Sequence, residues 1–291
     1  MSAPPAKSRA EMAAYGFTFA AACAPFVSIA ASQILLGAAL VAVLIHYRSL
    51  RMPRGLAVPL VLFFAGTLIA LALSPDPRAG FPQLKKFYVY LILPVAYTAF
   101  SGLKDVRRIV LGWTVLASAS GTWSFVQFFM KRQKALAAGE DFYRSYIGDR
   151  TTGFMSHWMT FGAEQMMALL LLLSALIFGL LQRHKILLWS GMAVISLSIV
   201  LGQTRSVWLG SALGAGYLIA AWRPKLLLVL PFAMPLGWFA APRSVQERVI
   251  SIYRPHGTTD SNQHRVVTAR TGIEMIIASP WVGLGPEIVC R

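Results

Sequence analysis

Charge is scarce in this chain, and negative charge is the scarcest: 11 Asp and Glu residues stand against 27 Lys and Arg residues among 291. Charged residues make up 13% of the sequence and hydrophobic residues 56%, with a mean hydropathy of +0.60. A soluble globule needs far more charge on its surface. The composition therefore indicates a membrane protein, in which each Lys or Arg has a topological or a functional reason.

The sequence also lacks the residues that several kinds of catalytic or binding site need. The two cysteines, Cys23 and Cys290, make no disulfide framework. The sequence contains no Gly-rich phosphate loop, no Cys/His metal cluster and no nucleophile elbow. Acids at the outer ends of the early apolar runs, which a metal site there would need, are limited to Asp76. We therefore expect no metal and no cofactor, and we expect any anion to be held by Arg and Lys.

Long apolar runs fill most of the chain. A transmembrane helix needs roughly 20 apolar residues, and the runs cover residues 12–47, 57–73, 84–100, 109–130, 154–181, 186–201, 206–222 and 226–240. The first run is too long for one crossing, so Pro25 predicts a hairpin of two helices. A break at 202–205 separates the runs on either side of it. We predict an all-α polytopic bundle with about nine transmembrane helices and no cleavable signal peptide.

Basic residues orient these spans. With the hairpin, short basic connectors fall on one side, which the positive-inside rule identifies as cytoplasmic; they hold Lys7, Arg9, Arg48, Arg51, Arg54, Lys104, Arg107, Arg108, Arg183, Lys185, Arg223 and Lys225. The other side receives residues 75–78, a loop at 131–153, Arg205 and everything after Ala241. We predict a transmembrane bundle over 1–240 and a non-cytoplasmic amphipathic helical segment over 241–291.

Some cations lie on the non-cytoplasmic side, where the positive-inside rule predicts few of them. Lys85 and Lys86 begin a span there, and they either snorkel to lipid headgroups or hold an anion. Thr204 is placed to cap the helix that begins at Arg205, so the open N–H groups, the helix dipole and a full positive charge coincide. This arrangement suits a phosphate or pyrophosphate, although a single interfacial Arg also pairs with lipid phosphate.

The tail contains a second candidate arginine. Residues 261–276 predict an amphipathic helix that ends at Ser279-Pro280. Arg270 has Glu274 four residues later, so a structural salt bridge is favoured for it. Arg265 has no acid at the neighbouring positions and is the better candidate for an external anion.

Three further segments have weaker signals. His157 and Trp158 open a long span, and a structural role is favoured for this histidine. The basic residues of the 131–150 loop, Arg150 included, fit a solvated surface. Val245, Val249 and Ile252 recur at helical spacing beside Arg248, which predicts a helix along the membrane surface.

Several motifs follow one another in a recognisable order: G-x-x-x-H-W at 153–158, Q-T-R-S-V-W-L-G at 203–210, and a tail with E-R-V-I-S-I-Y-R, S-N-Q-H-R and S-P-W-V-G-L-G-P. In their order and spacing they resemble the bacterial O-antigen ligase/polymerase superfamily. The resemblance covers nearly all 291 residues and is greatest to the ligase branch, which moves O-antigen polysaccharide from undecaprenyl pyrophosphate onto lipid A-core in lipopolysaccharide biosynthesis.

The resemblance implies a GT-C-like helical fold in the inner membrane, with metal-independent, inverting transfer on the periplasmic face. It makes Arg205 and Arg265 the catalytic, pyrophosphate-binding arginines, with Lys85 and Lys86 as helpers; Gln203 and His157 join them as donor-binding candidates. Fixed cations stabilise the charge that gathers on a diphosphate leaving group, and guanidinium binds phosphate bidentately. The expected partners are the lipid-linked O-antigen donor, the lipid A-core acceptor and membrane lipids, with no nucleic acid.

One departure concerns the base. Members of the superfamily continue past the G-x-G-P turn with a histidine that is expected to act on the acceptor hydroxyl, and neither His256 nor His264 matches its position. We therefore expect a sequence truncated at Arg291, with donor-site arginines but without the base.

Three alternatives stay open. An O-antigen polymerase or a protein O-glycosyltransferase of the same superfamily would share the donor and the arginines and differ in the acceptor. A polyprenyl-lipid transporter belongs to another class, in which cations would line a path across the bilayer. Their gathering on one side favours the enzyme.

Overall fold

The computed structural model describes residues 8–74, 76–252, 262–281 and 283. These residues form helices and connecting turns with no β-strand among them, as the all-α prediction requires. The chain divides into two compact units. The first unit comprises Met1–Ala22, Ala30–Ser101 and Ser261–Arg291, and the second comprises Cys23–Ile29 and Gly102–Asp260.

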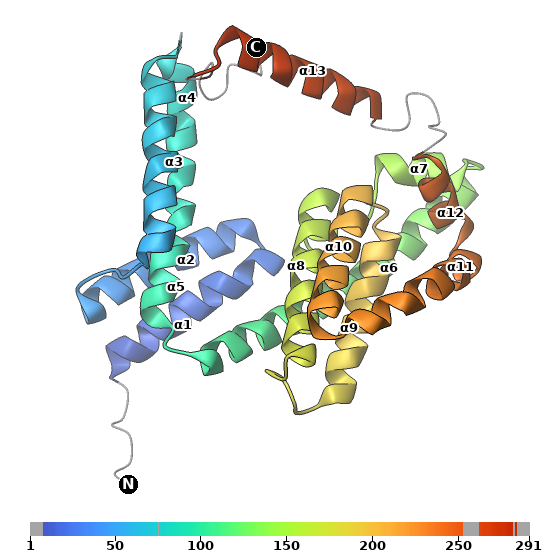
Figure 1. Cartoon of the computed structure of the whole chain (residues 1–291), viewed down its shortest axis with the longest axis horizontal. Helices are drawn as coiled ribbons and strands as arrows, with labels where there is room; N and C mark the ends of the chain where they lie inside the picture. The colour runs from blue at the N-terminus through green and yellow to red at the C-terminus, as the bar shows by residue number, and fades with distance from the viewer. Residues whose placement is uncertain (1–7, 75, 253–261, 282, 284–291) are drawn as a thin grey trace. The chain divides into compact units, whose positions relative to one another are not determined.

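The first unit begins with the predicted hairpin. Its helices are α1 (Arg9–Cys23), α2 (Ile29–Tyr47), α3 (Arg54–Ala72), α4 (Pro77–Leu84), the 3₁₀ segment η2 (Lys85–Leu91), α5 (Ile92–Ala99) and α13 (Asn262–Ala278). Pro25 lies in a 3₁₀ turn, η1 (Ala24–Phe26), and the chain reverses between α1 and α2 (Figure 1). The Ser32 hydroxyl donates to the Ala21 carbonyl at 2.8 Å across the hairpin. The break at Pro25 is confirmed.

Aromatic side chains join α3 to η2. The rings of Phe64 and Phe87 stack with centroids 4.6 Å apart, and Tyr90 meets Phe64 edge to face at 5.5 Å. Lys85 and Lys86 are exposed at the start of η2. On α13, which ends at Ala278 as predicted, Arg270 Nε lies 3.2 Å from Glu274 Oε1, so the predicted salt bridge is confirmed.

Four helices of the second unit lie side by side, namely α6 (Leu103–Ala137), α8 (Trp158–Ile177), α9 (Lys185–Leu201) and α10 (Arg205–Trp222) (Figure 1). Small residues bring α6 and α9 together: a Cβ on Gly191 would lie 3.1 Å from Ser118 Oγ, and one on Gly121 would lie 3.3 Å from Ser198 Cβ. The predicted break at 202–205 is confirmed, because α9 ends at Leu201 and α10 begins at Arg205.

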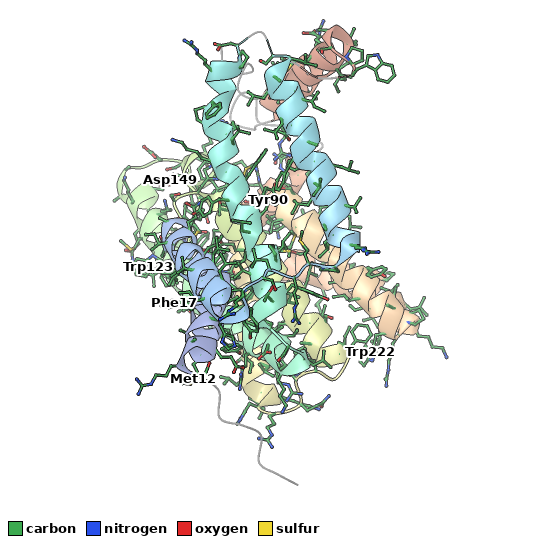
Figure 2. All side chains as sticks on the ribbon, turned by 90° about the vertical axis from the view of Figure 1, so that its left-hand side faces the viewer. Met12, Phe17, Tyr90, Trp123, Asp149 and Trp222 are labelled. Carbon is green, nitrogen blue, oxygen red and sulfur yellow. The ribbon has the colours of Figure 1, made fainter. Side chains whose placement is uncertain are left out.

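Shorter helices complete the second unit: α7 (Phe142–Gly148), the 3₁₀ segment η3 (Pro224–Val229), α11 (Leu230–Ala240) and α12 (Arg243–Ile250). In Figure 1, α7 and α12 lie at one end of the four-helix group, and α7 contacts both α6 and α12. Figure 2 shows Asp149, just after α7, and Trp222, at the C-terminus of α10, toward opposite ends of this unit. Helix α10 therefore runs away from the end that holds α7.

Among the described residues, four helices are long and apolar enough to cross a membrane: α2, α3, α6 and α8. Their apolar side chains face outward in part, as lipid-facing residues do; Ile34 and Val61 are examples, at 75% and 61% exposure. The run at 84–100 is divided between η2 and α5, and the run at 226–240 between η3 and α11, which contains Pro235. About nine spans, the GT-C-like arrangement and the division at residue 240 stay predictions.

The predicted loop at 131–153 is wrong for much of its length. Helix α6 continues to Ala137, because the residues after Met130 are strong helix formers. Gly139, two residues after the last helical residue, has a φ of +66°, the left-handed conformation that terminates helices. Asp141 then caps α7 by accepting a hydrogen bond from the Arg144 N–H at 2.9 Å.

Candidate anion-binding site

Three arginines from distant parts of the second unit converge beside the N-terminus of α10. Arg150 follows α7, Arg205 begins α10 and Arg248 lies in α12. Arg150 and Arg248 are buried, with exposures of 6% and 2%, and Arg205 is half-buried. Burial, then the positive charge of Arg248 and, more weakly, that of Arg205 lower the pKa of Arg150 to about 10. Mutual repulsion of this kind is relieved when an anion binds.

Backbone and side-chain oxygens hold Arg248 in place. Its Nε donates to the Gln203 carbonyl at 3.1 Å, and its Nη1 donates to the Tyr143 hydroxyl at 3.5 Å. These bonds tie α12 to the connector before α10 and to α7. The guanidinium is thereby fixed in direction as well as position, which favours bidentate recognition of a phosphate.

The other two arginines are fixed in the same way. Arg150 donates from Nε to the Ile147 carbonyl at 3.2 Å and from Nη1 to the Thr204 hydroxyl at 3.5 Å. Its guanidinium lies 5.3 Å from the ring centre of Trp158, a cation–π distance. Arg205 donates from Nη1 to the Ser251 carbonyl at 3.5 Å. Each arginine thus has at least one hydrogen-bond partner in a distant segment of the chain.

The connector between α9 and α10 adds polar groups to the cluster. Gln203 is fully buried with a φ of +48°, a conformation that residues other than glycine adopt rarely. Neither its amide oxygen nor its amide nitrogen has a hydrogen-bond partner among the described residues. A fully buried amide without a hydrogen-bond partner requires an explanation, and a bound ligand provides one.

Thr204 occupies the N-cap of α10 as predicted, but it makes no side-chain capping bond. Its hydroxyl donates to the Gly202 carbonyl at 3.2 Å and accepts from Arg150. The predicted side-chain cap is therefore wrong, because a tertiary partner competes for the hydroxyl. The first N–H groups of α10, at the positive end of its dipole, are left without this cap.

The loop that carries Arg150 is anchored on α6. Gln127 Oε1 accepts from the backbone N–H groups of Thr152 and Gly153, both at 3.0 Å, and its Nε2 donates to the Gly153 carbonyl at 3.0 Å. Ser120 Oγ accepts from the Phe154 N–H at 3.1 Å. Gly153 has a φ of +58°, and a Cβ there would lie 2.4 Å from Ser120 Oγ. Only glycine fits this turn.

Tyr146 also anchors the loop that carries Arg150, through its hydroxyl group. Its hydroxyl donates to the Leu201 carbonyl at 2.7 Å and lies 3.2 Å from the Thr151 hydroxyl. Burial raises the pKa of this phenol to about 12. The neutral hydroxyl therefore ties α7 to the end of α9, directly before the connector that carries Gln203.

The structure brings together only some of the predicted site residues. Gln203 and Arg205 belong to the cluster. His157 is exposed and caps α8, with Nδ1 accepting from the Met159 N–H at 3.1 Å, and it stacks on Trp158 at 4.3 Å. This geometry agrees with a structural role for the histidine.

The remaining predicted site residues are exposed in the first unit: Lys85, Lys86 and Arg265. Their part in the donor site stays a prediction. The two histidines considered for the base, His256 and the side chain of His264, fall outside the residues that the structure describes.

Sequence reasoning missed two arginines of the cluster. Arg150 was predicted on a solvated surface, and that prediction is wrong because the side chain packs between Trp158 and Thr204. Arg248 was predicted only as a residue beside an apolar face, yet it is the least exposed of the three. Each follows an acid directly in the sequence, which suggests surface charge pairing. The signal that could have identified Arg248 is its position one helical turn after the buried Val245.

The apolar helices indicate a multi-pass membrane protein that is helical over the described residues, and the buried cations form a candidate anion site at one end of its second unit. Residues 191–290 match the family model described as O-antigen ligase, and this match supports the chain as a member of the O-antigen ligase family. The matched range includes Gln203, Arg205 and Arg248. No curated protein and no solved structure gives a significant match.

Proposed function

We propose that this protein transfers O-antigen polysaccharide from undecaprenyl pyrophosphate to lipid A-core, with the diphosphate held by Arg150, Arg205 and Arg248. The observation that carries the proposal is the convergence of three hydrogen-bonded guanidinium groups beside the N-terminus of α10, where Gln203 is buried with an unpartnered amide. A diphosphate has the charge and the oxygen geometry that such a cluster recognises. The family match supports a lipid-linked sugar as the substrate class.

The reaction would be an inverting displacement at the anomeric carbon. The acceptor hydroxyl oxygen forms the new bond to C1 while the bond from C1 to the diphosphate oxygen breaks, and the electron pair of that bond goes to the diphosphate. The arginines stabilise this charge more in the transition state than in the ground state, which accelerates the step. We expect no metal in this role. The reaction would take place on the periplasmic face of the inner membrane.

The distribution of buried cations favours an enzyme over a polyprenyl-lipid carrier. At the other end of the second unit, Arg183, Lys185 and Arg223 are exposed, as the positive-inside rule expects of cytoplasmic connectors. A carrier needs comparable polar sites along its path, whereas buried, hydrogen-bonded arginines gather here at one end only among the described residues of this unit.

The test combines binding with transfer. Wild-type protein in micelles should bind undecaprenyl diphosphate, and Arg205→Ala should lower the affinity about tenfold or more, as loss of charged hydrogen bonds does. In a ligase-deficient strain, Arg205→Ala should abolish O-antigen attachment to lipid A-core. Undiminished attachment by Arg205→Ala would show that the donor site lies elsewhere.

A matched pair on α13 tests the contribution of the first unit. Arg265→Ala should abolish attachment, whereas Arg270→Ala, which removes the salt bridge to Glu274, should mainly lower stability. If lipid-linked chains become longer without any attachment to lipid A-core, the protein is instead a polymerase of the same superfamily.

A further inference from the structure

A polar cavity of about 290 Å³ opens beside the arginine cluster. It is lined by Asp141, Tyr143 and Arg144 from α7 and its cap, and by Glu247 from α12. Its volume falls near the lower end of the roughly 300–1,000 Å³ that small-molecule sites span. It is therefore large enough for a small polar ring rather than for an extended polymer.

One residue belongs to both the cavity and the cluster. Tyr143 lines the cavity, is only 3% exposed, and accepts a hydrogen bond from Arg248 Nη1 through its hydroxyl. The hydrogen bond from Arg248 to Tyr143, at 3.5 Å, therefore places the wall of the cavity in direct contact with the proposed diphosphate site. A group attached directly to the diphosphate can reach the cavity.

We propose that this cavity binds the sugar ring attached to the diphosphate of the donor, with the carboxylates of Glu247 and Asp141 accepting hydrogen bonds from ring hydroxyl or amide groups. This inference rests on the proposed function. Ionised carboxylates accept strong hydrogen bonds, and Arg144 supplies donors for ring oxygens. One Asp141 oxygen already accepts from the Arg144 N–H, which fixes the carboxylate in the cavity wall.

The experiment compares two probes on the full chain in micelles: farnesyl diphosphate, and farnesyl diphosphate linked to one N-acetylhexosamine. The measured quantity is the ratio of their dissociation constants. A variant that changes diphosphate binding alone affects both probes equally and leaves this ratio unchanged. We expect the sugar-bearing probe to bind wild type about tenfold tighter or more, the effect of one or two charged hydrogen bonds.

The variants Glu247→Gln and Asp141→Asn should remove most of this ratio. Asn is as good a helix cap as Asp, so Asp141→Asn preserves α7. The matched control is Glu140→Gln, an exposed acid one residue before Asp141 that does not line the cavity, and it should retain the ratio.

A ratio near one in wild type, or a ratio unchanged by both cavity variants, would overturn the sugar site while leaving the proposed function intact. Failure of both probes to bind wild type would instead reject the diphosphate site, and the sugar site with it.

Discussion

The Nε of Arg248 donates a hydrogen bond to the backbone carbonyl of Gln203 at 3.1 Å, across 45 residues of sequence. This bond joins α12 to the connector between two apolar helices. It depends on the backbone of Gln203, whose φ of +48° directs the carbonyl out of the helical path. At its Nε, the buried Arg248 is thus held by a carbonyl of strained backbone and not by a carboxylate.

Replacing Arg248 should impair anion binding more than replacing any exposed arginine of the same helix. Arg248→Gln removes a fixed charge and its hydrogen bonds, so we expect affinity for undecaprenyl diphosphate to fall roughly 10- to 100-fold. The matched control is Arg243→Gln, because Arg243 is exposed at the start of α12. Equal affinities for the two variants, measured by titration in micelles, would remove Arg248 from the site.

Anion binding should stabilise the protein through Arg150. Burial and, after it, neighbouring positive charges lower the pKa of this guanidinium to about 10, so an anion relieves unfavourable electrostatics when it binds. Inorganic pyrophosphate at 100 times its dissociation constant should stabilise wild type by about 2.7 kcal/mol, seen as a rise in Tm. Arg150→Gln should show a much smaller rise at the same concentration, and Arg132→Gln, at an exposed position late in α6, should behave as wild type.

Gln203→Gly separates the backbone role of Gln203 from the role of its amide. Glycine relaxes the left-handed conformation, which offsets its own entropic cost of roughly 0.5–1 kcal/mol in the folded chain. We expect Tm to change little while pyrophosphate affinity falls several-fold, because the unpartnered amide is lost. If Tm and affinity fall together, the amide acts in folding rather than in binding.

Local signals in the sequence were sufficient for the breaks between helices. Pro25 marks the first turn, Gly202–Arg205 the break before α10, and Ser279-Pro280 follows the end of α13. The salt bridge from Arg270 to Glu274 follows from their spacing of four residues. Each of these features depends on residues that are neighbours in the chain.

The cluster itself depends on packing that no local signal determines. Asp149-Arg150 and Glu247-Arg248 look like charged surface pairs, yet both arginines are buried because α7 and α12 pack together at the end of α6. The Thr204 hydroxyl is a further example: its position in the sequence predicts a helix cap, but the guanidinium of Arg150, which is distant in the sequence, competes for it. Arg205 was predictable because its helix start is visible in the sequence.

Tyr146→Phe should destabilise the protein in a pH-dependent manner. The variant loses the bond to the Leu201 carbonyl, which costs about 1 kcal/mol at pH 8. The folded-state pKa of the phenol, about 12, lies above its ordinary value of 10. Wild type therefore has its full stability below pH 10 and loses it progressively as the pH rises from 10 to 12, whereas the variant has no phenol to ionise.

The difference between the two proteins should accordingly shrink above pH 10. Unfolding in micelles at pH 8, 9, 10, 11 and 11.5 measures it, and the comparison cancels the titration of lysines common to both proteins. A constant difference across this range would mean that the Tyr146 hydroxyl is accessible to water in the folded protein.

Three glycines allow the strain in the Arg150 loop to be dissected. Gly148 has neither a positive φ nor a neighbour within 4 Å of an added Cβ, so Gly148→Ala should change stability little. Gly139 has a φ of +66° and open space, so Gly139→Ala should cost only the left-handed backbone term of about 1–2 kcal/mol. Gly153→Ala adds a clash with the Phe161 ring at 2.5 Å, and over-packing brings its cost to roughly 2–5 kcal/mol.

This order also predicts function. Because Gly153 and Thr152 are held by Gln127, displacement of this turn moves Arg150 away from Thr204. Gly153→Ala should therefore lose pyrophosphate binding, while Gly139→Ala retains it despite a measurable loss of stability. If Gly139→Ala weakens binding as much as Gly153→Ala, general destabilisation explains both, and the anchoring of Arg150 through Gln127 is not what forms the site.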